Sequence, residues 1–143
     1  MNEYINLDEK NIAEEHICCA IGDPKHQDGV DKKKEWIKSK LKDGHVFRKL
    51  NARGKIFIEY EPIETAWVPI NGKNYMHIYC LWVAGSFKGK GIGKELLEYA
   101  IEDAKKKNSR FPLFYKGLRV TYHNTVYTCV RSHMDMVHFY LLY

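Results

Sequence analysis

The sequence predicts a single domain of the mixed α/β class, with a sheet flanked by helices. Three observations support this prediction. An almost unbroken apolar and aromatic run covers residues 75–83, as in a strand that is buried on both faces. Residues 45–60, which precede it, alternate like two strands joined by a turn. The clearest amphipathic stripe of the chain follows it, over residues 92–108, and predicts a helix.

The first third of the chain predicts a strand and two helices. Residues 4–7 are a short strand candidate, and Asp8 is a suitable N-cap for a short helix that runs through residue 15. From residue 30 to residue 42 the apolar positions fall on one helical stripe. We expect Gly44 to end this second helix, because glycine is the usual residue just beyond a helix terminus.

The middle of the chain predicts the sheet. Residues 45–50 and 55–60 are expected to be strands, with residues 51–54 as the turn between them. Residues 66–68 are expected to continue the extended run, and Asn71-Gly72 is a second turn signal. The strand at residues 75–83 would then lie at the centre of the sheet.

Length and composition exclude several classes of protein. The 143 residues show no internal repeat or linker, so residues 1–143 are expected to form one domain. No stretch approaches the roughly 20 apolar residues that span a bilayer, and polar residues interrupt the N-terminal segment, which favours a cytoplasmic protein without a membrane partner. The net charge of +5 suits an anionic partner, but the lysines cluster on helix-like segments and no nucleic-acid-binding motif is present. The oligomeric state is open, a dimer included.

The four cysteines predict neither a disulfide framework nor a metal site. Cys18 and Cys19 are adjacent, Cys80 and Cys129 are isolated, and no C-x-x-C pair exists. His16 and Cys18 could supply two metal ligands, but no second pair stands at a suitable spacing. We therefore expect buried free thiols and no metal.

The connection between the central strand and the last helix has the composition of a phosphate-binding turn. Three glycines alternate with and adjoin three lysines, namely Lys88, Gly89, Lys90, Gly91, Gly93 and Lys94. The first N–H groups of a helix have no partners inside the helix, and the helix dipole adds positive potential there, so a helix N-terminus attracts anions. Glycine allows positive φ angles and a close approach of the ligand. A simple strand-to-helix connection would need only one glycine.

Two common phosphate-binding motifs do not match this turn. A Walker A loop would require a glycine at position 88, which is Lys88, and a hydroxyl residue at position 95, which is Glu95. The dinucleotide fingerprint G-x-G-x-x-G also fails, because the third glycine follows the second by two residues. The ligand is therefore expected to be a phosphate compound of another class.

Residues Leu81–Leu97 resemble motif A of the GNAT superfamily of N-acetyltransferases. That motif consists of a strand ending in L-x-V, a short connection, Q/R-x-x-G-x-G/A and an amphipathic helix. As architecture, the resemblance covers about residues 4–107. It implies a mixed, mostly antiparallel central sheet flanked by helices, with a splayed central strand before the pyrophosphate turn. It also implies transfer of an acetyl group from acetyl-CoA to a primary amine of a small molecule or peptide, by direct attack.

The resemblance assigns cofactor-binding roles by position. Backbone groups on the central strand would bind the acetyl oxygen and the pantetheine arm, and amides of the turn would hold the pyrophosphate of CoA. The expected cofactor-binding residues are Leu81, Trp82, Val83, Lys88, Gly89, Lys90, Gly91, Ile92, Gly93 and Lys94. Lys88 departs from the usual Gln or Arg, and Gly85 stands where a proline is common. Because backbone N–H groups make much of the phosphate contact, we expect both departures to be tolerated.

The catalytic residues are left open. The chemistry of the family needs a general base for the ammonium proton and an acid for the leaving thiolate. His77 and Tyr79 share one side of the central strand, and Glu59 and Glu61 lie on the preceding strand, so these are the candidates for the base. A lone histidine in an apolar strand is also typical of a packed residue without a catalytic role.

The C-terminal part departs from the family pattern. Beyond Asn108 lysines and acids give way to arginine, tyrosine and histidine, and the Y-x-x-x-G-F signature that supplies the acid is missing. Tyr122 and Tyr127 remain as guesses for this role. Residues 110–143 are therefore interpreted as a divergent or incomplete end. The alternative to an active enzyme is a non-catalytic or truncated acyl-CoA-binding protein of the same fold.

Overall fold

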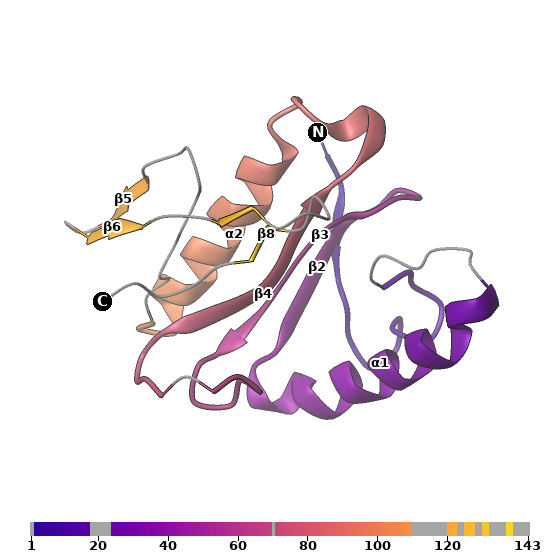
Figure 1. The fold of residues 1–143 in the computed structure, drawn as a ribbon, viewed down its shortest axis with the longest axis horizontal. Helices are drawn as coiled ribbons and strands as arrows, with labels where there is room; N and C mark the ends of the chain where they lie inside the picture. The colour runs from indigo at the N-terminus through magenta and orange to yellow at the C-terminus, as the bar shows by residue number, and fades with distance from the viewer. Residues whose placement is uncertain are drawn as a thin grey trace.

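The computed structural model describes residues 2–17, 24–69 and 71–109, and beyond these the backbone of four short strands. The helices and strands are β1 (Tyr4–Asn6), α1 (Gln27–Lys40), β2 (Val46–Leu50), β3 (Ile56–Pro62), β4 (Met76–Val83), α2 (Ile92–Lys106), β5 (Val120–Tyr122), β6 (Thr125–Tyr127), β7 (Val130–Arg131) and β8 (Val137–His138). Short 3₁₀ helices precede α1, follow it and precede α2, at Pro24–His26, Leu41–Asp43 and Gly85–Phe87. Helices α1 and α2 lie on opposite sides of the sheet (Figure 1).

The main sheet has the strand order β1-β2-β3-β4-β8-β7, and β5 and β6 form a separate hairpin. Every described pair is antiparallel, which confirms the expected mixed α/β fold with a mostly antiparallel sheet. Strand β4 pairs with β3 along its length, from Ile56↔Val83 to Pro62↔Met76. On its other side it meets β8 at the single register position Leu81↔Val137.

Each face of the sheet carries its own apolar core because side chains alternate along a strand. The face under α2 is sealed by the apolar stripe of that helix, Ile92, Leu96, Ala100 and Ala104, all buried. The opposite face packs Ile37 of α1 against Phe47 and Phe57, whose rings stack at 4.7 Å between centroids. Strand β4 contributes side chains to both cores and therefore lies between them.

Both predicted long helices are confirmed. α1 begins three residues earlier than expected, and Gly44 follows it and the adjoining 3₁₀ turn in the left-handed conformation, with φ of 91°. α2 is followed by Asn108, whose φ of 51° is one that asparagine tolerates better than most residues. Within the described residues, no helix combines the length and the apolar character needed to cross a bilayer.

Two expected elements are wrong. Residues 9–15 form hydrogen-bonded turns and no helix, although Asp8 Oδ1 accepts the N–H groups of Lys10 and Asn11 as a cap would. So short a segment does not repay the cost of helix nucleation. Residues 66–68 form no strand, because the N–H of Ala66 closes a turn on the carbonyl of Pro62 and leaves the ladder.

Candidate functional site

The turn between β4 and α2 is open and depends on glycine. Gly89 and Gly91 have φ angles of 77° and 80°, which side-chain-bearing residues rarely adopt. A Cβ atom at either position would meet no described atom within 4 Å. Residues 88–91 are exposed, so described neighbours leave the bend uncovered. The backbone of this turn is therefore accessible to a ligand.

The start of α2 presents backbone donors to this opening. The first N–H of the helix to reach a carbonyl one turn earlier is that of Glu95, which donates to Gly91 O at 3.1 Å. The amides of Ile92, Gly93 and Lys94 precede it, and the first N–H groups of a helix have no partner within the helix. Gly91 is the N-cap and offers no side chain to satisfy them. Amides in this position, together with the helix dipole, attract anions, so the start of α2 is a candidate anion site.

Two lysines of the turn, Lys90 and Lys94, lie close to this opening in the sequence. The Lys94 ammonium is 3.6 Å from Glu98 Oε1, in an exposed i,i+4 pair of the kind that contributes little stability. The Lys90 ammonium lies 5.8 Å from the centroid of the Phe87 ring. Neither contact removes the positive charge, so both add to the attraction of the helix N-terminus for an anion.

The acid in the first turn of α2 is held by the N-terminal strand. Glu95 Oε2 accepts hydrogen bonds from Asn2 Nδ2 at 3.0 Å and from the Tyr4 hydroxyl at 2.5 Å. These two hydrogen bonds lower the pKa of Glu95 below its usual value. Figure 1 places the N-terminus beside the start of α2, in agreement with these contacts. A carboxylate that would repel a phosphate is thus tied to β1.

A β-bulge lies in the middle of β4. Glu59 of β3 pairs with Cys80, but the next residue, Tyr60, pairs with Ile78, so Tyr79 is the extra residue. A bulge of this kind redirects a side chain. The Tyr79 ring lies on the α1 side, edge-on to Trp36 at 5.7 Å between centroids.

Under α1 the bulge meets a buried cluster of charged groups. His45 Nδ1 is 2.8 Å from Glu61 Oε2, and His45 Nε2 is 3.3 Å from Glu59 Oε1. The outer oxygens have partners as well, since Lys33 Nζ is 2.7 Å from Glu59 Oε2 and the Tyr79 hydroxyl donates to Glu61 Oε1 at 2.7 Å. The side chains of His45 and Glu61 are 0% exposed and that of Glu59 is 2% exposed.

Burial and neighbouring groups in this cluster shift the pKa values of His45, Glu59 and Tyr79. Burial by itself would lower the pKa of His45, but the hydrogen bonds and charges of Glu59 and Glu61 outweigh it and raise the pKa. Burial would raise the pKa of Glu59, and His45 with Lys33 lowers it instead. Burial and the hydrogen bond to Glu61 raise the pKa of Tyr79, so its hydroxyl keeps its proton.

The structure brings some of the catalytic candidates together. Tyr79 and Glu59 belong to the buried cluster, and the His77 ring stands edge-on to Tyr79 at 4.7 Å between centroids. Both carboxylate oxygens of Glu59 are engaged by Lys33 and His45, so Glu59 is poorly placed to take a proton from a substrate. The Tyr122 and Tyr127 side chains lie outside the described residues, as do Cys18, Cys19 and Cys129, whereas Cys80 is buried.

Sequence reasoning missed His45 and Lys33. The signal was the presence of two glutamates at alternate positions in a strand that is otherwise apolar, since buried carboxylates require cationic partners. The partners come from β2 and α1, which the sequence alone does not place. Within the part of the chain that the structure describes, no group of three His, Cys, Asp or Glu side chains is arranged to hold a metal ion.

Side chains and the backbone of β8 lie close to the end of β4, where the pantetheine arm of CoA is expected to bind. Leu81 is buried, Trp82 and Val83 are half-buried, and the Lys55 ammonium lies 5.7 Å from the centroid of a Trp82 ring. The backbone of β8 lies beside this edge at Leu81. The edge beyond Leu81 is where the expected splay of the central strand would open.

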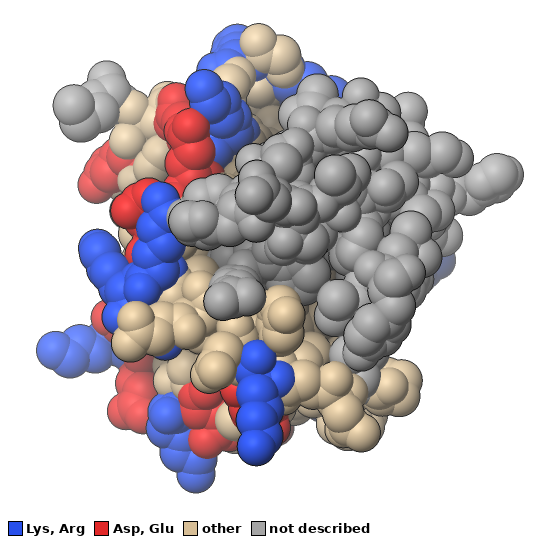
Figure 2. All heavy atoms as spheres, turned by 90° about the vertical axis from the view of Figure 1, so that its left-hand side faces the viewer, with Lys and Arg blue, Asp and Glu red and all other residues tan. Residues whose placement is uncertain are grey.

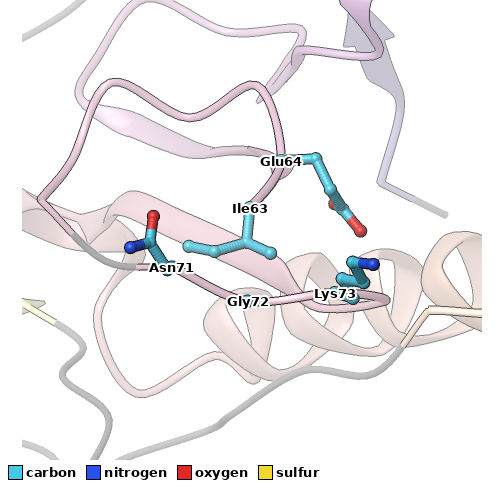
Figure 3. Close-up of a pocket in the computed structure, with 5 residues that line it drawn as sticks. All are labelled: Ile63, Glu64, Asn71, Gly72 and Lys73. Carbon is cyan, nitrogen blue, oxygen red and sulfur yellow. The ribbon is translucent and has the colours of Figure 1, made fainter.

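A surface hollow lies near the other end of β4. It has a volume of about 580 Å³ and is lined by Ile63, Glu64, Asn71, Gly72 and Lys73. Figure 3 shows the Glu64 and Lys73 side chains on one side of it and Asn71 on the other. The length of β4, about 23 Å for its seven steps, separates this hollow from the glycine turn. It is therefore distinct from the anion site.

Basic side chains do not gather into one patch on the face drawn in Figure 2. There, the described lysines and arginines are interspersed with acids. Elsewhere on the described helices, basic side chains also pair with acids, at Lys32–Asp28, Lys105–Glu102 and Lys107–Asp103. The described residues of this face therefore form no basic stripe of the kind that binds nucleic acid.

Comparisons with known proteins agree with this geometry. The sequence profile described as the acetyltransferase (GNAT) family matches residues 11–125. A relative is the "Uncharacterized N-acetyltransferase YoaP" of Bacillus subtilis (strain 168), which is 47% identical over 102 residues. The match covers 71% of this chain but 41% of that protein, so the chain spans less than half the length of this relative. No solved structure matches significantly. The chain belongs to the acetyltransferase (GNAT) family.

Proposed function

We propose that the chain is an acetyltransferase that moves an acetyl group from acetyl-CoA to a primary amine of a small molecule or peptide. The observation that carries the proposal is the open N-terminus of α2, where Gly89 and Gly91 leave space for a ligand next to unpaired amides. Membership of the GNAT family and the name of the Bacillus subtilis relative support acetyl transfer in general.

The residues of the turn suit the pyrophosphate of CoA. Backbone N–H groups from Gly89 to Lys94 would hold the two phosphates, and the lysine ammonium groups would add charge. The expected contribution of the Lys88 N–H is less favourable, because that N–H donates to Gly85 O at 3.2 Å. The absence of side-chain atoms at Gly89 and Gly91 lets the phosphates approach the backbone closely. Glu95 would remain turned away, because Asn2 and Tyr4 bind its carboxylate.

The end of β4 suits the reactive part of the same ligand. When bound, acetyl-CoA supplies an activated thioester. Backbone N–H groups of Leu81, Trp82 and Val83 would polarise its carbonyl, in the manner of an oxyanion hole. His77, which lies on the same strand, remains a candidate for handling the proton of the attacking amine, whereas the Tyr79 hydroxyl is already held by Glu61 and by the N–H of Trp67.

A Gly91→Glu substitution tests directly whether the glycine turn and the start of α2 bind the CoA phosphates. The added carboxylate would fill the space that the phosphates need and would repel them, so we expect calorimetric affinity for acetyl-CoA to fall at least about a hundredfold. Gly29→Glu is the matched control, because Gly29 is exposed on α1 and a Cβ atom there meets nothing within 4 Å. If circular dichroism shows that both variants are folded and Gly91→Glu keeps its affinity for acetyl-CoA, the glycine turn does not bind the CoA phosphates.

A second candidate function is acyl-CoA binding without catalysis. The pairing of β8 with β4 at Leu81 favours it, since a strand at this edge competes with the pantetheine arm for backbone groups. The two functions separate in a thiol-release assay over a panel of amines. Turnover above the rate without protein supports the enzyme, and tight binding of acetyl-CoA without thiol release supports the binding protein.

A further inference from the structure

The buried cluster under α1 joins four elements into one chain of contacts. In order these are Tyr79 on β4, Glu61 on β3, His45 next to β2, Glu59 on β3 and Lys33 on α1, at 2.7, 2.8, 3.3 and 2.7 Å. The proposed acetyl transfer has no assigned role for the three central members. Buried charges are costly, so a cluster of this size requires an explanation.

The geometry indicates that His45 carries a positive charge. Each ring nitrogen lies next to a buried carboxylate, but a neutral imidazole has only one N–H. In the neutral form, one glutamate would therefore face a lone pair in a buried site. As an imidazolium, His45 together with Lys33 balances the charges of Glu59 and Glu61. Among the described residues, His45 Nε2 is the one buried side-chain nitrogen or oxygen that lacks a hydrogen bond of good geometry, so its contact with Glu59 is ionic.

The charge of His45 is linked to the shape of β4. Glu61, which His45 holds through Nδ1, accepts the hydroxyl of Tyr79 with its other oxygen. That hydroxyl also accepts the backbone N–H of Trp67 at 2.9 Å. Tyr79 is the extra residue of the bulge, so its hydrogen bonds to Glu61 and Trp67 stabilise the conformation of the bulge. Leu81, the first residue expected to bind the acetyl group, comes only two positions later.

We propose that His45 is a positioning residue for acetyl transfer, which acts through Glu61 and Tyr79 on the bulge of β4 and thereby aims the backbone amides at the reacting carbonyl. The inference rests on the proposed function. Loss of this support would let the Tyr79 side chain and the bulge relax. A misplacement of about 1 Å at a reacting centre costs on the order of a hundredfold in rate. Binding of the CoA phosphates, which would contact the turn beyond the end of β4, would be largely spared.

The neighbours of His45 define the expected pH dependence. It faces Glu59 and Glu61 on β3, the Tyr79 ring at 5.7 Å on β4 and the edge of Trp36 on α1, with Lys33 reached through Glu59. As the pH rises and His45 loses its proton, one carboxylate loses its donor. The support of the bulge then weakens, and the advantage that His45 gives to catalysis disappears.

The test compares His45→Gln with Tyr79→Phe and with the double variant. Each single variant is expected to lower kcat on the order of tenfold to a hundredfold, while Kd for acetyl-CoA changes by less than about threefold. The double variant should lose little more than either single one, because both act through Glu61. The wild-type to His45→Gln ratio of kcat should fall toward one as the pH rises. His16→Gln, at an exposed histidine, is the matched control and should leave kcat unchanged.

The outcomes separate this inference from the function it rests on. If the wild type neither binds acetyl-CoA nor releases thiol, the proposed function is wrong. If the wild type is active and the kcat ratio is constant with pH, or if the two single losses add in the double variant, His45 has only a structural role. Unfolding curves of each variant establish the temperature at which all of them are folded, and kcat is measured there.

Discussion

Gly89 and Gly93 lie four residues apart but serve different purposes. Gly89 has a positive φ and open space around it, so its backbone conformation is the reason for glycine. Gly93 is the second residue of α2, and a Cβ atom there would lie 3.5 Å from Val83 Cγ2, an ordinary contact. The stability of the fold therefore does not require glycine at this position. Close approach of a ligand to the backbone would explain it.

The same substitution at the two positions should have opposite effects on stability. We expect Gly89→Ala to lower the free energy of unfolding by about 1 kcal/mol, because alanine resists the left-handed conformation. We expect Gly93→Ala to raise it by about 0.5 kcal/mol through better helix propensity. Urea denaturation of both variants measures the difference. Equal shifts would mean that the turn does not have the backbone described.

Single residues differ in how far the sequence reveals their role. The requirement at Gly89 and Gly91 is local, since it depends on the backbone of one turn, and the spacing of the glycines predicted it. The role of His45 depends on Glu59 and Glu61 across a strand pair and on Lys33 across a helix packing. Nothing within a few residues of His45 indicates these partners, so only the folded structure identifies them.

Among the elements, α1 and the strand after it are joined by a turn that requires glycine. Gly44 has φ of 91°, and a Cβ atom there would lie 3.1 Å from Pro62 Cγ. We expect Gly44→Ala to lower the free energy of unfolding by about 1–2 kcal/mol, because the backbone is strained and the contact is tight. Urea denaturation is the measurement.

Gly29→Ala provides the control for this element. Gly29 lies inside α1 with nothing near its Cβ position, so alanine should raise the free energy of unfolding by about 0.5–1 kcal/mol. Because Gly44 immediately precedes His45, Gly44→Ala should also reduce kcat if His45 supports the bulge. A destabilised but fully active Gly44→Ala would show that the turn has no influence on the site.

Elements with a strong periodic pattern were predictable and short ones were not. The stripe of α2 and the apolar run of β4 fix these elements because many residues agree. Residues 9–15 have the cap at Asp8 but too few residues to form a helix. The bulge at Tyr79 leaves no trace in the pattern, because the run on both sides of it is apolar and aromatic throughout.

For the molecule as a whole, the cluster predicts how stability depends on pH. The pKa of His45 is raised in the folded state, so its contribution is complete below about pH 6.5 and is lost as the pH rises through the folded pKa. The pKa of Glu59 is lowered, so its contribution is present above the ordinary glutamate pKa of 4.5 and is lost as the pH falls through the folded pKa. The free energy of unfolding should therefore be greatest between about pH 4.5 and pH 6.5.

Urea denaturation over a series of pH values checks this profile. The wild type should lose stability on both sides of the maximum, and His45→Gln should lose less than the wild type on the alkaline side. Glu95 and Glu102, whose pKa values are also lowered, are exposed and add little on the acid side. A wild-type curve that keeps rising above pH 8 or so would contradict a charged His45.

At this scale the sequence predicted the class of fold and the glycine turn between β4 and α2, but it did not predict the order of the sheet. The pairing of β4 with β8 joins segments more than 50 residues apart in sequence (Leu81↔Val137), and the tail offers no local signal for it. That residues 1–143 form one domain stays a prediction, as do the cofactor-binding roles assigned by resemblance.

The hold of β1 on Glu95 has a thermal consequence. β1 is only three residues long and pairs with β2 alone among the described strands, so it is the part of the sheet that should fray first on warming. Fraying would free the Glu95 carboxylate to swing toward the anion site. Affinity for a phosphate ligand would then decline at temperatures where the two apolar cores are still intact.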